Sequence, residues 1–296
     1  MKRITVAAAA ILTAGAMAFA GGSTEAKPAA AAGFKGEYKL GGSTTIETVV
    51  RTAIEAFAKK QPGAKLSYES NGSATGITGV IDGVYTLAGS SRDLTAEEKT
   101  KGAVENPVLL DALSIIVNGS VPVADLTRRQ LADIFNGTVR NWKDVGGPDK
   151  AIVFINRDEA SGTRTAVSDL VLLKEYKKGE AGAGFLKDAV TVTSNGDMVT
   201  KVGSTPDSIG YCGMGYVDQA KSAGAKDVTI AKVAANTANV LNKTYSLSRY
   251  CYLISKGAIK DGTLEKAFLD FILSAEGQVI VKQEGFIPLP KQAGAS

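Results

Sequence analysis

Four times in this chain, a short run typical of a β-strand ends in a loop of glycine and hydroxyl residues, and a helix-like run follows. These loops are Gly41-Gly42-Ser43-Thr44-Thr45, Ser70-Asn71-Gly72-Ser73-Ala74-Thr75-Gly76, Gly89-Ser90-Ser91-Arg92-Asp93 and Arg157-Asp158-Glu159-Ala160-Ser161-Gly162-Thr163-Arg164. In the runs that follow them, apolar residues recur every three or four positions, which indicates helices. This alternation predicts an α/β fold with mainly parallel sheets, whose loops gather at the carboxyl ends of the strands.

The fourth loop has the densest set of groups that can bind an anion. Arg157 can offer two parallel donors to a tetrahedral oxyanion, and Ser161 and Thr163 add hydroxyl donors. Gly162 lets the backbone approach closely, and the first turn of a helix has N–H groups without intrahelical partners. Alone, this loop fits equally well a serine helix cap beside two solvated arginines. Four such loops favour one oxyanion pocket over four independent caps.

The first residues have the pattern of an export signal. Lys2 and Arg3 precede an alanine-rich apolar segment, and Ala18-Phe19-Ala20 has the form of a cleavage site. We predict a signal peptide over residues 1–20 and a disordered leader over residues 21–35. No cysteine follows the cleavage site directly, so no lipid anchor is expected there. No later apolar run is long enough to span a bilayer.

Composition argues against several classes of function. The chain has no histidine, which disfavours zinc or copper sites and acid–base catalysis near neutral pH. It lacks a carboxylate cluster with metal-ligand spacing and a lysine in a phosphate loop, so a phosphatase or phosphoryl-transfer enzyme is not expected. Removal of Lys2 and Arg3 lowers the formal net charge from +4 to +2, too small for a nucleic-acid-binding protein. We therefore expect no enzyme, cofactor, metal or nucleic-acid partner.

Two cysteines occur in runs that are predicted to be strands. Cys212 lies in a predicted strand over residues 208–217, and Cys251 lies in one over residues 250–254. In an oxidising compartment an even number of cysteines permits one disulfide. Two buried free thiols that pack as small apolar side chains are equally compatible with the sequence.

The four loops and several segments between them resemble those of a known protein family. The loops around Ser43, Ser73 and Ser91 and the loop from Arg157 to Arg164 resemble the ligand loops of periplasmic phosphate-binding proteins, which serve phosphate-specific ABC transporters. The segments Asn141-Trp142 and Ile209-Gly210-Tyr211 are similar as well. The resemblance implies the type II periplasmic binding fold, with two lobes joined by two hinge crossovers. Each lobe is a mixed, mainly parallel sheet flanked by helices.

The resemblance also implies lobe boundaries and a function. Lobe 1 is expected over residues 36–118 and 246–296, and lobe 2 over residues 119–245. The implied function is that of a monomeric periplasmic protein that captures inorganic phosphate between its lobes and delivers it to the permease of an ABC transporter. Carried over by position, the phosphate-binding residues are Ser43, Thr44, Thr45, Ser73, Ser91, Arg157, Ser161, Gly162 and Thr163. The alternatives are a protein for sulfate, molybdate or tungstate, and a phosphate sensor or adhesin on the same fold.

One position departs from the family. Many relatives have an aspartate at the position of Ser91, and that carboxylate accepts the proton of hydrogen phosphate and repels fully ionised sulfate. Ser91 can also accept a hydrogen bond, but it penalises sulfate less. Asp93, Asp158 and Glu159 are candidates for the missing acceptor, although Asp158 and Glu159 are equally suited to orienting Arg157.

Overall fold

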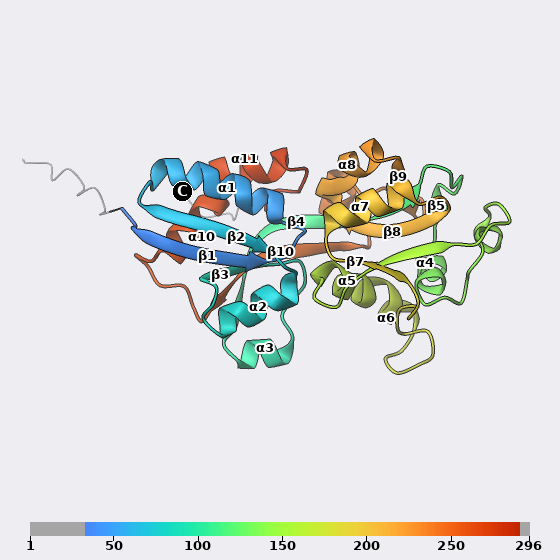
Figure 1. Ribbon diagram of the computed structural model, residues 1–296, viewed down its shortest axis with the longest axis horizontal. Helices are drawn as coiled ribbons and strands as arrows, with labels where there is room; N and C mark the ends of the chain where they lie inside the picture. The colour runs from blue at the N-terminus through green and yellow to red at the C-terminus, as the bar shows by residue number, and fades with distance from the viewer. Residues whose placement is uncertain (1–32, 291–296) are drawn as a thin grey trace, which may run out of the picture. The chain divides into compact units, whose positions relative to one another are not determined.

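The computed structural model describes residues 33–290, and its strands form one path of hydrogen-bonded neighbours (Figure 1). The strands are β1 (Gly36–Gly42), β2 (Ala64–Ser70), β3 (Leu87–Ser90), β4 (Ala103–Asn118), β5 (Asp125–Leu126), β6 (Val153–Arg157), β7 (Val190–Val192), β8 (Ser208–Gly213), β9 (Ala225–Ile230) and β10 (Ser248–Lys256). Their order is β2-β1-β3-β10-β4-β8-β6-β7, with β9 beside β4 and β5 beside β9.

The two ends of this path are parallel, and its centre is antiparallel. β1 pairs in parallel with β2 and β3, and β6 pairs in parallel with β7 and β8. β10 is antiparallel to β3 and β4, and β4 is antiparallel to β8. Along β4, residues through Ala112 pair with β10, and residues from Leu113 pair with β8. One continuous strand therefore connects the two halves of the sheet, which has the mixed α/β character that the sequence predicted.

Helices cover both faces of the strands. They are α1 (Glu47–Lys60), α2 (Ser73–Ile81), α3 (Ala96–Thr100), α4 (Arg128–Phe135), α5 (Gly162–Val167), α6 (Leu173–Glu175), α7 (Asn195–Ser204), α8 (Val217–Ser222), α9 (Thr237–Leu241), α10 (Leu264–Leu273) and α11 (Ala275–Gln283). Figure 1 shows α1 and α11 above β1 and β2, and α2 and α3 below them. Short 3-10 turns lie at Trp142–Val145 and Met214–Tyr216, and a π-helical turn at Ser168–Leu172 joins α5 to α6.

Aromatic side chains fill the cores on both sides of β4. In one cluster, the ring of Phe57 on α1 lies 5.4 Å from that of Phe268 on α10. In another, Phe135 stacks on Phe154 at 4.7 Å beside the buried Trp142. Edge and offset contacts of this kind add to the free energy of apolar burial. These cores hold the strand ends, and hence the loops, in fixed positions.

The two cysteines are buried free thiols, which decides between the two alternatives left open by the sequence. They lie on the strands that flank β4, where Cys212 pairs with Ser114 and Cys251 pairs with Leu109. The five-residue offset between these partners corresponds to about 16 Å along a strand. A disulfide needs Cα atoms about 6 Å apart. Burial raises the pKa of both thiols well above its ordinary value.

Further predictions concern the strand over residues 208–217, the N-terminal residues 1–35 and the absence of a membrane-spanning run. The predicted strand is too long, because β8 ends at Gly213 and residues from Met214 onward are helical. The predicted signal peptide (1–20) and most of the predicted leader (21–35) lie outside the described residues. Within residues 33–290, no helix combines the length and the apolar character that a membrane crossing requires.

Candidate functional site

The four loops singled out in the sequence lie at the carboxyl ends of strands and converge. Thr44 and Thr45 follow β1, Ser73 opens α2 after β2, Ser91 follows β3, and Arg157 ends β6. All nine predicted residues are buried, and each side chain among them is at most 3% exposed. The nine are Ser43, Thr44, Thr45, Ser73, Ser91, Arg157, Ser161, Gly162 and Thr163. The structure therefore brings together every residue of the predicted set.

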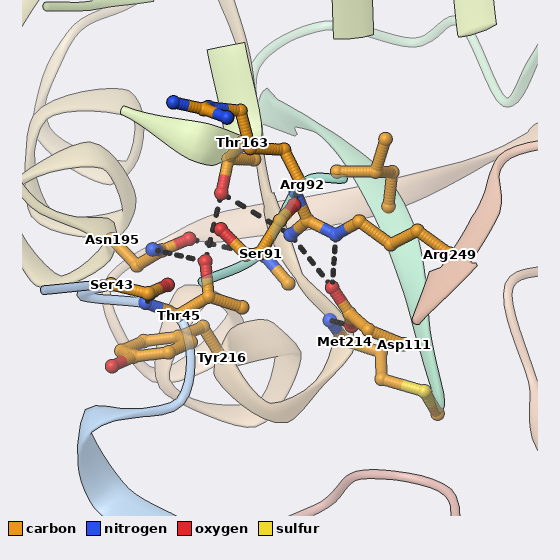
Figure 2. Close-up of polar contacts among 12 residues, drawn as sticks. Ser43, Thr45, Ser91, Arg92, Asp111, Thr163, Asn195, Met214, Tyr216 and Arg249 are labelled. Carbon is orange, nitrogen blue, oxygen red and sulfur yellow. Dashed lines mark hydrogen bonds and ion pairs between the residues drawn. The ribbon is translucent and has the colours of Figure 1, made fainter. Parts of the chain in front are cut away.

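Hydroxyl groups from distant segments meet at the centre of this set. The Oγ1 atoms of Thr45 and Thr163 lie 2.8 Å apart, and Figure 2 shows this contact as a bridge between the loop after β1 and helix α5. Ser73 Oγ lies 3.4 Å from Ser91 Oγ and accepts the Ser91 amide at 3.1 Å. Direct polar contacts thereby join the four loops in two pairs: the loop after β1 with the loop after β6, and the loop after β2 with the loop after β3.

Arg157 is the cationic side chain of the predicted set, and it is only 2% exposed. Its Nη2 donates to Thr44 Oγ1 at 3.2 Å and to the Thr193 carbonyl at 2.8 Å. Its Nε and Nη1 are buried and have no hydrogen-bond partner among the described residues. Burial lowers its pKa from the ordinary arginine value, and the nearby Tyr211 and Asp158 oppose that shift. The site thus contains a guanidinium with two donors available to a ligand.

Helix α5 carries the second part of the loop. Ser161 caps it by accepting the Arg164 amide at 3.2 Å, so the capping interpretation is correct for this serine. That interpretation also expected two solvated arginines. In the structure, however, Arg157 is buried, and Arg164 packs over the Phe185 ring at 5.1 Å. A serine can cap a helix and still offer its O–H to a ligand.

Gly162 is required by the close approach of α5 to the loops after β2 and β3. A Cβ atom at this position would lie 2.3 Å from Ser73 Oγ and 2.8 Å from Ser91 Oγ. Both separations are shorter than any van der Waals contact of a real Cβ, so any larger residue would push the helix away. The glycine therefore sets the distance between the two walls of the site.

Three buried side chains belong to this site although the sequence did not single them out. Asn195, at the start of α7, donates through Nδ2 to Thr44 Oγ1 at 2.9 Å and to Thr45 Oγ1 at 3.1 Å. Arg249 and Asp111 form a buried ion pair beside Thr163 (Figure 2). Asn195 could have been found from the sequence, because it opens helix α7 at a fifth strand-to-helix junction, after β7. The sequence contains no comparable signal for the ion pair, since Arg249 and Asp111 are each a single charged residue within an apolar strand.

The electrostatics of that pair reflect its burial. Asp111 Oδ2 accepts from Arg249 Nε at 2.9 Å and from Nη2 at 2.7 Å, and Asp111 Oδ1 accepts the Met214 amide at 2.9 Å. Burial raises the pKa of Asp111, and the positive charge of Arg249 counteracts that shift. The pair places no uncompensated charge beside the hydroxyl groups.

Six hydroxyl groups of the site each accept a hydrogen bond from an N–H group. Ser43 accepts from the Thr45 amide (3.1 Å), Thr44 from Arg157 Nη2 (3.2 Å), Thr45 from Asn195 Nδ2 (3.1 Å), Ser73 from the Ser91 amide (3.1 Å), Ser161 from the Arg164 amide (3.2 Å) and Thr163 from Arg249 Nη2 (3.2 Å). A hydroxyl that accepts in this way keeps its O–H for another acceptor. The O–H groups of these six side chains are therefore oriented to donate, to a ligand or to a neighbouring hydroxyl.

Ser91 is the exception. In the described part of the chain, its Oγ has only Ser73 Oγ, at 3.4 Å, as a hydrogen-bonding neighbour. Its lone pairs consequently remain available, and Ser91 can accept a hydrogen bond from a ligand as well as donate one.

The acidic candidates for an acceptor differ in position. Asp93 accepts from the Tyr252 hydroxyl at 2.6 Å, and Glu159, 91% exposed, pairs with Arg164 at 3.4 Å. The pKa of Asp158 is raised by burial and lowered by Arg157 and Arg164. Its buried Oδ1 has no partner within residues 33–290. Asp93 and Glu159 are thus directed to other partners, and Asp158 lies beside the cation.

Comparison with known proteins assigns the chain to a family. A family model described as a PBP superfamily domain matches residues 23–276. The phosphate-binding protein PstS of Borreliella burgdorferi is 36% identical over 248 residues, which cover 84% of this chain and 88% of that protein. PstS of Bacillus subtilis is 30% identical over 280 residues, with coverages of 91% and 88%.

Solved structures agree with this assignment. A putative phosphate ABC transporter substrate-binding protein of Clostridium perfringens, with bound phosphate, is 33% identical and has a TM-score of 0.77. An ABC-type phosphate transport receptor of Vibrio cholerae is 29% identical, with a TM-score of 0.69. Each alignment covers 86% of this chain and 100% of the solved one. The fold is therefore the type II binding-protein fold that the sequence predicted, and the chain belongs to the phosphate-binding protein (PstS) family of the PBP superfamily.

Proposed function

We propose that this protein binds inorganic phosphate through the nine buried residues named above and delivers it to the permease of an ABC transporter. The observation that carries the proposal is the buried Arg157, which donates through Nη2 to Thr44 Oγ1 and whose Nε and Nη1 have no hydrogen-bond partner among the described residues. The site hydroxyls that accept from N–H groups supply further donors. A tetrahedral oxyanion is the ligand that can accept all of these hydrogen bonds at once. The name of the Clostridium perfringens relative, whose structure contains phosphate, supports the choice of anion.

The physical basis of binding is the replacement of water by fixed donors. Dehydrating a charged phosphate is costly, and neutral O–H donors offset that cost without reorganisation, because the structure already holds them. Each hydrogen bond to a charged group contributes about 1.5–3 kcal/mol. Arg157 adds a positive charge, whereas the charge of Arg249 is balanced by Asp111. Capture thus requires no chemistry, and we propose a binding protein rather than an enzyme.

Ser91 gives a modest preference for phosphate over sulfate in this proposal. Hydrogen phosphate carries a proton that needs an acceptor, and Ser91 Oγ is the hydroxyl that accepts no N–H. Sulfate has no such proton, but the Ser91 hydroxyl can rotate and donate to it. A carboxylate in this position could not do so and would leave two acceptors facing each other. We therefore expect discrimination weaker than that of relatives with aspartate here.

The proposed division into lobes is the one that the family resemblance implies. We propose lobe 1 over residues 36–118 and 246–296 and lobe 2 over residues 119–245, with β4 and β10 as the two crossovers. The change of partners along β4, at Ala112 and Leu113, supports a hinge in this strand. In the structure α5 already lies against the loops after β2 and β3, which is the arrangement that we expect of closed lobes that exclude water. A monomer exported to the periplasm through the predicted signal peptide is the form we expect to meet the permease.

The deciding experiment is isothermal titration of the exported protein with phosphate, sulfate and molybdate. We expect phosphate to bind tightly at micromolar protein concentration and sulfate to bind more weakly. Absence of heat with phosphate would refute the proposal. Equal affinities for phosphate and sulfate would instead identify a general tetrahedral oxyanion-binding protein. Co-purification with a membrane permease tests the transport role separately, and its failure alongside phosphate binding would favour a sensor or adhesin.

A further inference from the structure

Arg249 contacts three different segments around the proposed site. It lies on β10 directly opposite Asp111 on β4, and the two side chains are 6% and 0% exposed. Its Nε and Nη2 bind the Asp111 carboxylate, Nη1 donates to the Ser91 carbonyl at 2.8 Å, and Nη2 also donates to Thr163 Oγ1 at 3.2 Å. Figure 2 shows the guanidinium with Asp111 on one side and Thr163 on the other.

These contacts fix the orientation of two groups that face the anion site. Because Thr163 Oγ1 accepts from Arg249, its O–H is directed to Thr45 Oγ1 or to a ligand. Because the Ser91 carbonyl is held by Arg249 and the Ser91 amide by Ser73, the backbone of this residue cannot turn. The Ser91 side chain is left as the adjustable group of its loop.

The contacts also connect the two halves of the sheet path on either side of β10 and β4. Ser91 follows β3, whereas Thr163 lies on α5 after β6. Arg249 therefore bridges a loop of proposed lobe 1 to a helix of proposed lobe 2. A planar guanidinium with five donors suits this role, whereas the single ammonium of a lysine cannot keep all three directions.

We infer that Arg249, held by Asp111, is a positioning residue that orients Thr163 and Ser91 for the bound anion and stabilises the closed arrangement of the two loops. The inference rests on the proposed phosphate-binding function. Its charge is balanced by Asp111, so its contribution is geometric rather than electrostatic. Loss of Arg249 should therefore speed release of the anion more than it slows capture.

The first test separates positioning from folding. Replacing a buried ion pair by apolar residues of similar volume is often neutral for stability, whereas removing one partner is not. We expect Arg249→Met/Asp111→Leu to keep the melting temperature of the unliganded protein but to lose about tenfold to a hundredfold in phosphate affinity. Stopped-flow measurements should place the loss in the dissociation rate. The matched control is the surface pair variant Lys266→Ala/Asp270→Ala. Affinity within twofold of wild type in the double apolar variant would overturn the inference.

The second test does not depend on that variant being stable. A double-mutant cycle combines Arg249→Lys with Thr163→Val, and phosphate affinity is measured for each single variant and for the pair. If Arg249 acts partly through Thr163, the pair should cost clearly less than the sum of the two single variants, and the loss beyond Thr163→Val alone reports on Ser91. Additive losses would contradict the inference. The proposed function is tested on the wild type alone: if the wild type does not bind phosphate, the proposed function fails. In that case the double-mutant cycle is measured with the oxyanion that the wild type does bind, so the role of Arg249 is still tested.

Discussion

Thr45 and Thr163 are 118 positions apart in the chain, yet their hydroxyl oxygens lie 2.8 Å from each other. One follows β1 and the other lies in the first turn of α5, so this contact closes the site across the two halves of the sheet. Every residue of the predicted set lies within this network or beside a member of it. The following variants test the parts of the network separately.

Replacement of Arg157 should remove most of the affinity for phosphate. Arg157→Ala deletes both available donors and the buried charge, and we expect no binding at micromolar protein concentration. Arg157→Lys keeps the charge but loses the planar fork, and a loss of about a hundredfold or more is expected. Titration calorimetry measures both. Arg140→Ala, which removes an exposed arginine that pairs with Asp188, is the control and should bind like wild type.

Variants of Ser91 should change selectivity. Ser91→Asp introduces an acceptor that cannot donate, so the ratio of phosphate to sulfate affinity should rise by about tenfold or more. Ser91→Ala removes the acceptor and should weaken phosphate more than sulfate. Titration of the wild type, Ser91→Asp and Ser91→Ala with phosphate and with sulfate measures these changes in selectivity. Weaker phosphate binding by Ser91→Asp with no gain in discrimination would show that another residue, such as Asp158, already serves as the acceptor.

Gly162→Ala should separate binding from stability. Its Cβ would meet Ser73 Oγ at 2.3 Å and Ser73 Cβ at 2.8 Å, so α5 and the loops after β2 and β3 must move apart and the anion loses part of its donors. We expect a drop in phosphate affinity of at least about tenfold, with a melting temperature close to wild type. Gly184→Ala is the matched control, since a Cβ atom added at that position would meet nothing within 4 Å. Unchanged affinity in Gly162→Ala would mean that the helix approaches the loops less closely than described.

Glu98 should contribute stability that is lost in acid. It accepts from Arg92 at 2.8 and 2.6 Å and from the Thr95 amide at 2.8 Å. Burial by itself raises the pKa of Glu98, but the bonds from Arg92 and Thr95 outweigh it, so the pKa is lowered. A lowered folded-state pKa stabilises the protein fully above the unfolded value of about 4.3, and the effect is lost as the pH falls below that value and through the lower folded-state pKa.

The corresponding measurement is chemical unfolding of Glu98→Gln between pH 7 and pH 3. We expect a loss of about 1–2 kcal/mol at pH 7 and a smaller difference from wild type at pH 3. Glu97→Gln affects a neighbouring glutamate whose partner Lys101 is exposed, and it should change little. A Glu98 difference that stays constant with pH would contradict the assignment.

Both cysteines should be unreactive in the folded protein. Burial raises the pKa of Cys212 and Cys251, and a buried thiol forms little of the thiolate that attacks labelling reagents. Mass spectrometry after brief exposure to a maleimide should find no label under native conditions and two labels after denaturation. A reducing agent should leave the melting temperature unchanged. A fall in melting temperature on reduction would instead indicate a disulfide.

How far the sequence predicts this structure depends on how local each signal is. Ser73, Ser161 and Thr163 were found because a strand, a hydroxyl loop and a helix start lie within a few residues of one another. The end of β8 was missed because its causes are distant: the Met214 amide donates to Asp111, and the Tyr216 hydroxyl donates to the Thr44 carbonyl. Nothing near residues 213–217 in the sequence contains those partners.

Arg249 and Asp111 show the same limit for the site. Each is a single charge in a strand-like apolar run, and only the antiparallel register of β10 and β4 places them opposite each other. β9 was also missed, because Lys226 and Asp227 interrupt its apolar residues. Features that depend on strand pairing therefore could not be predicted from the sequence, whereas features that depend on residues near one another in the chain could.

The partner change along β4 has a mechanical consequence. β4 passes without a break from its β10 pairing to its β8 pairing, and Asp111 sits beside the point of change. Any motion that separates the loops must therefore bend or twist an intact strand instead of unfolding a flexible linker. Asp111 on this strand and Arg249 opposite it would move with such a bend, which would therefore reach the Ser91 carbonyl and Thr163 through the hydrogen bonds of Arg249.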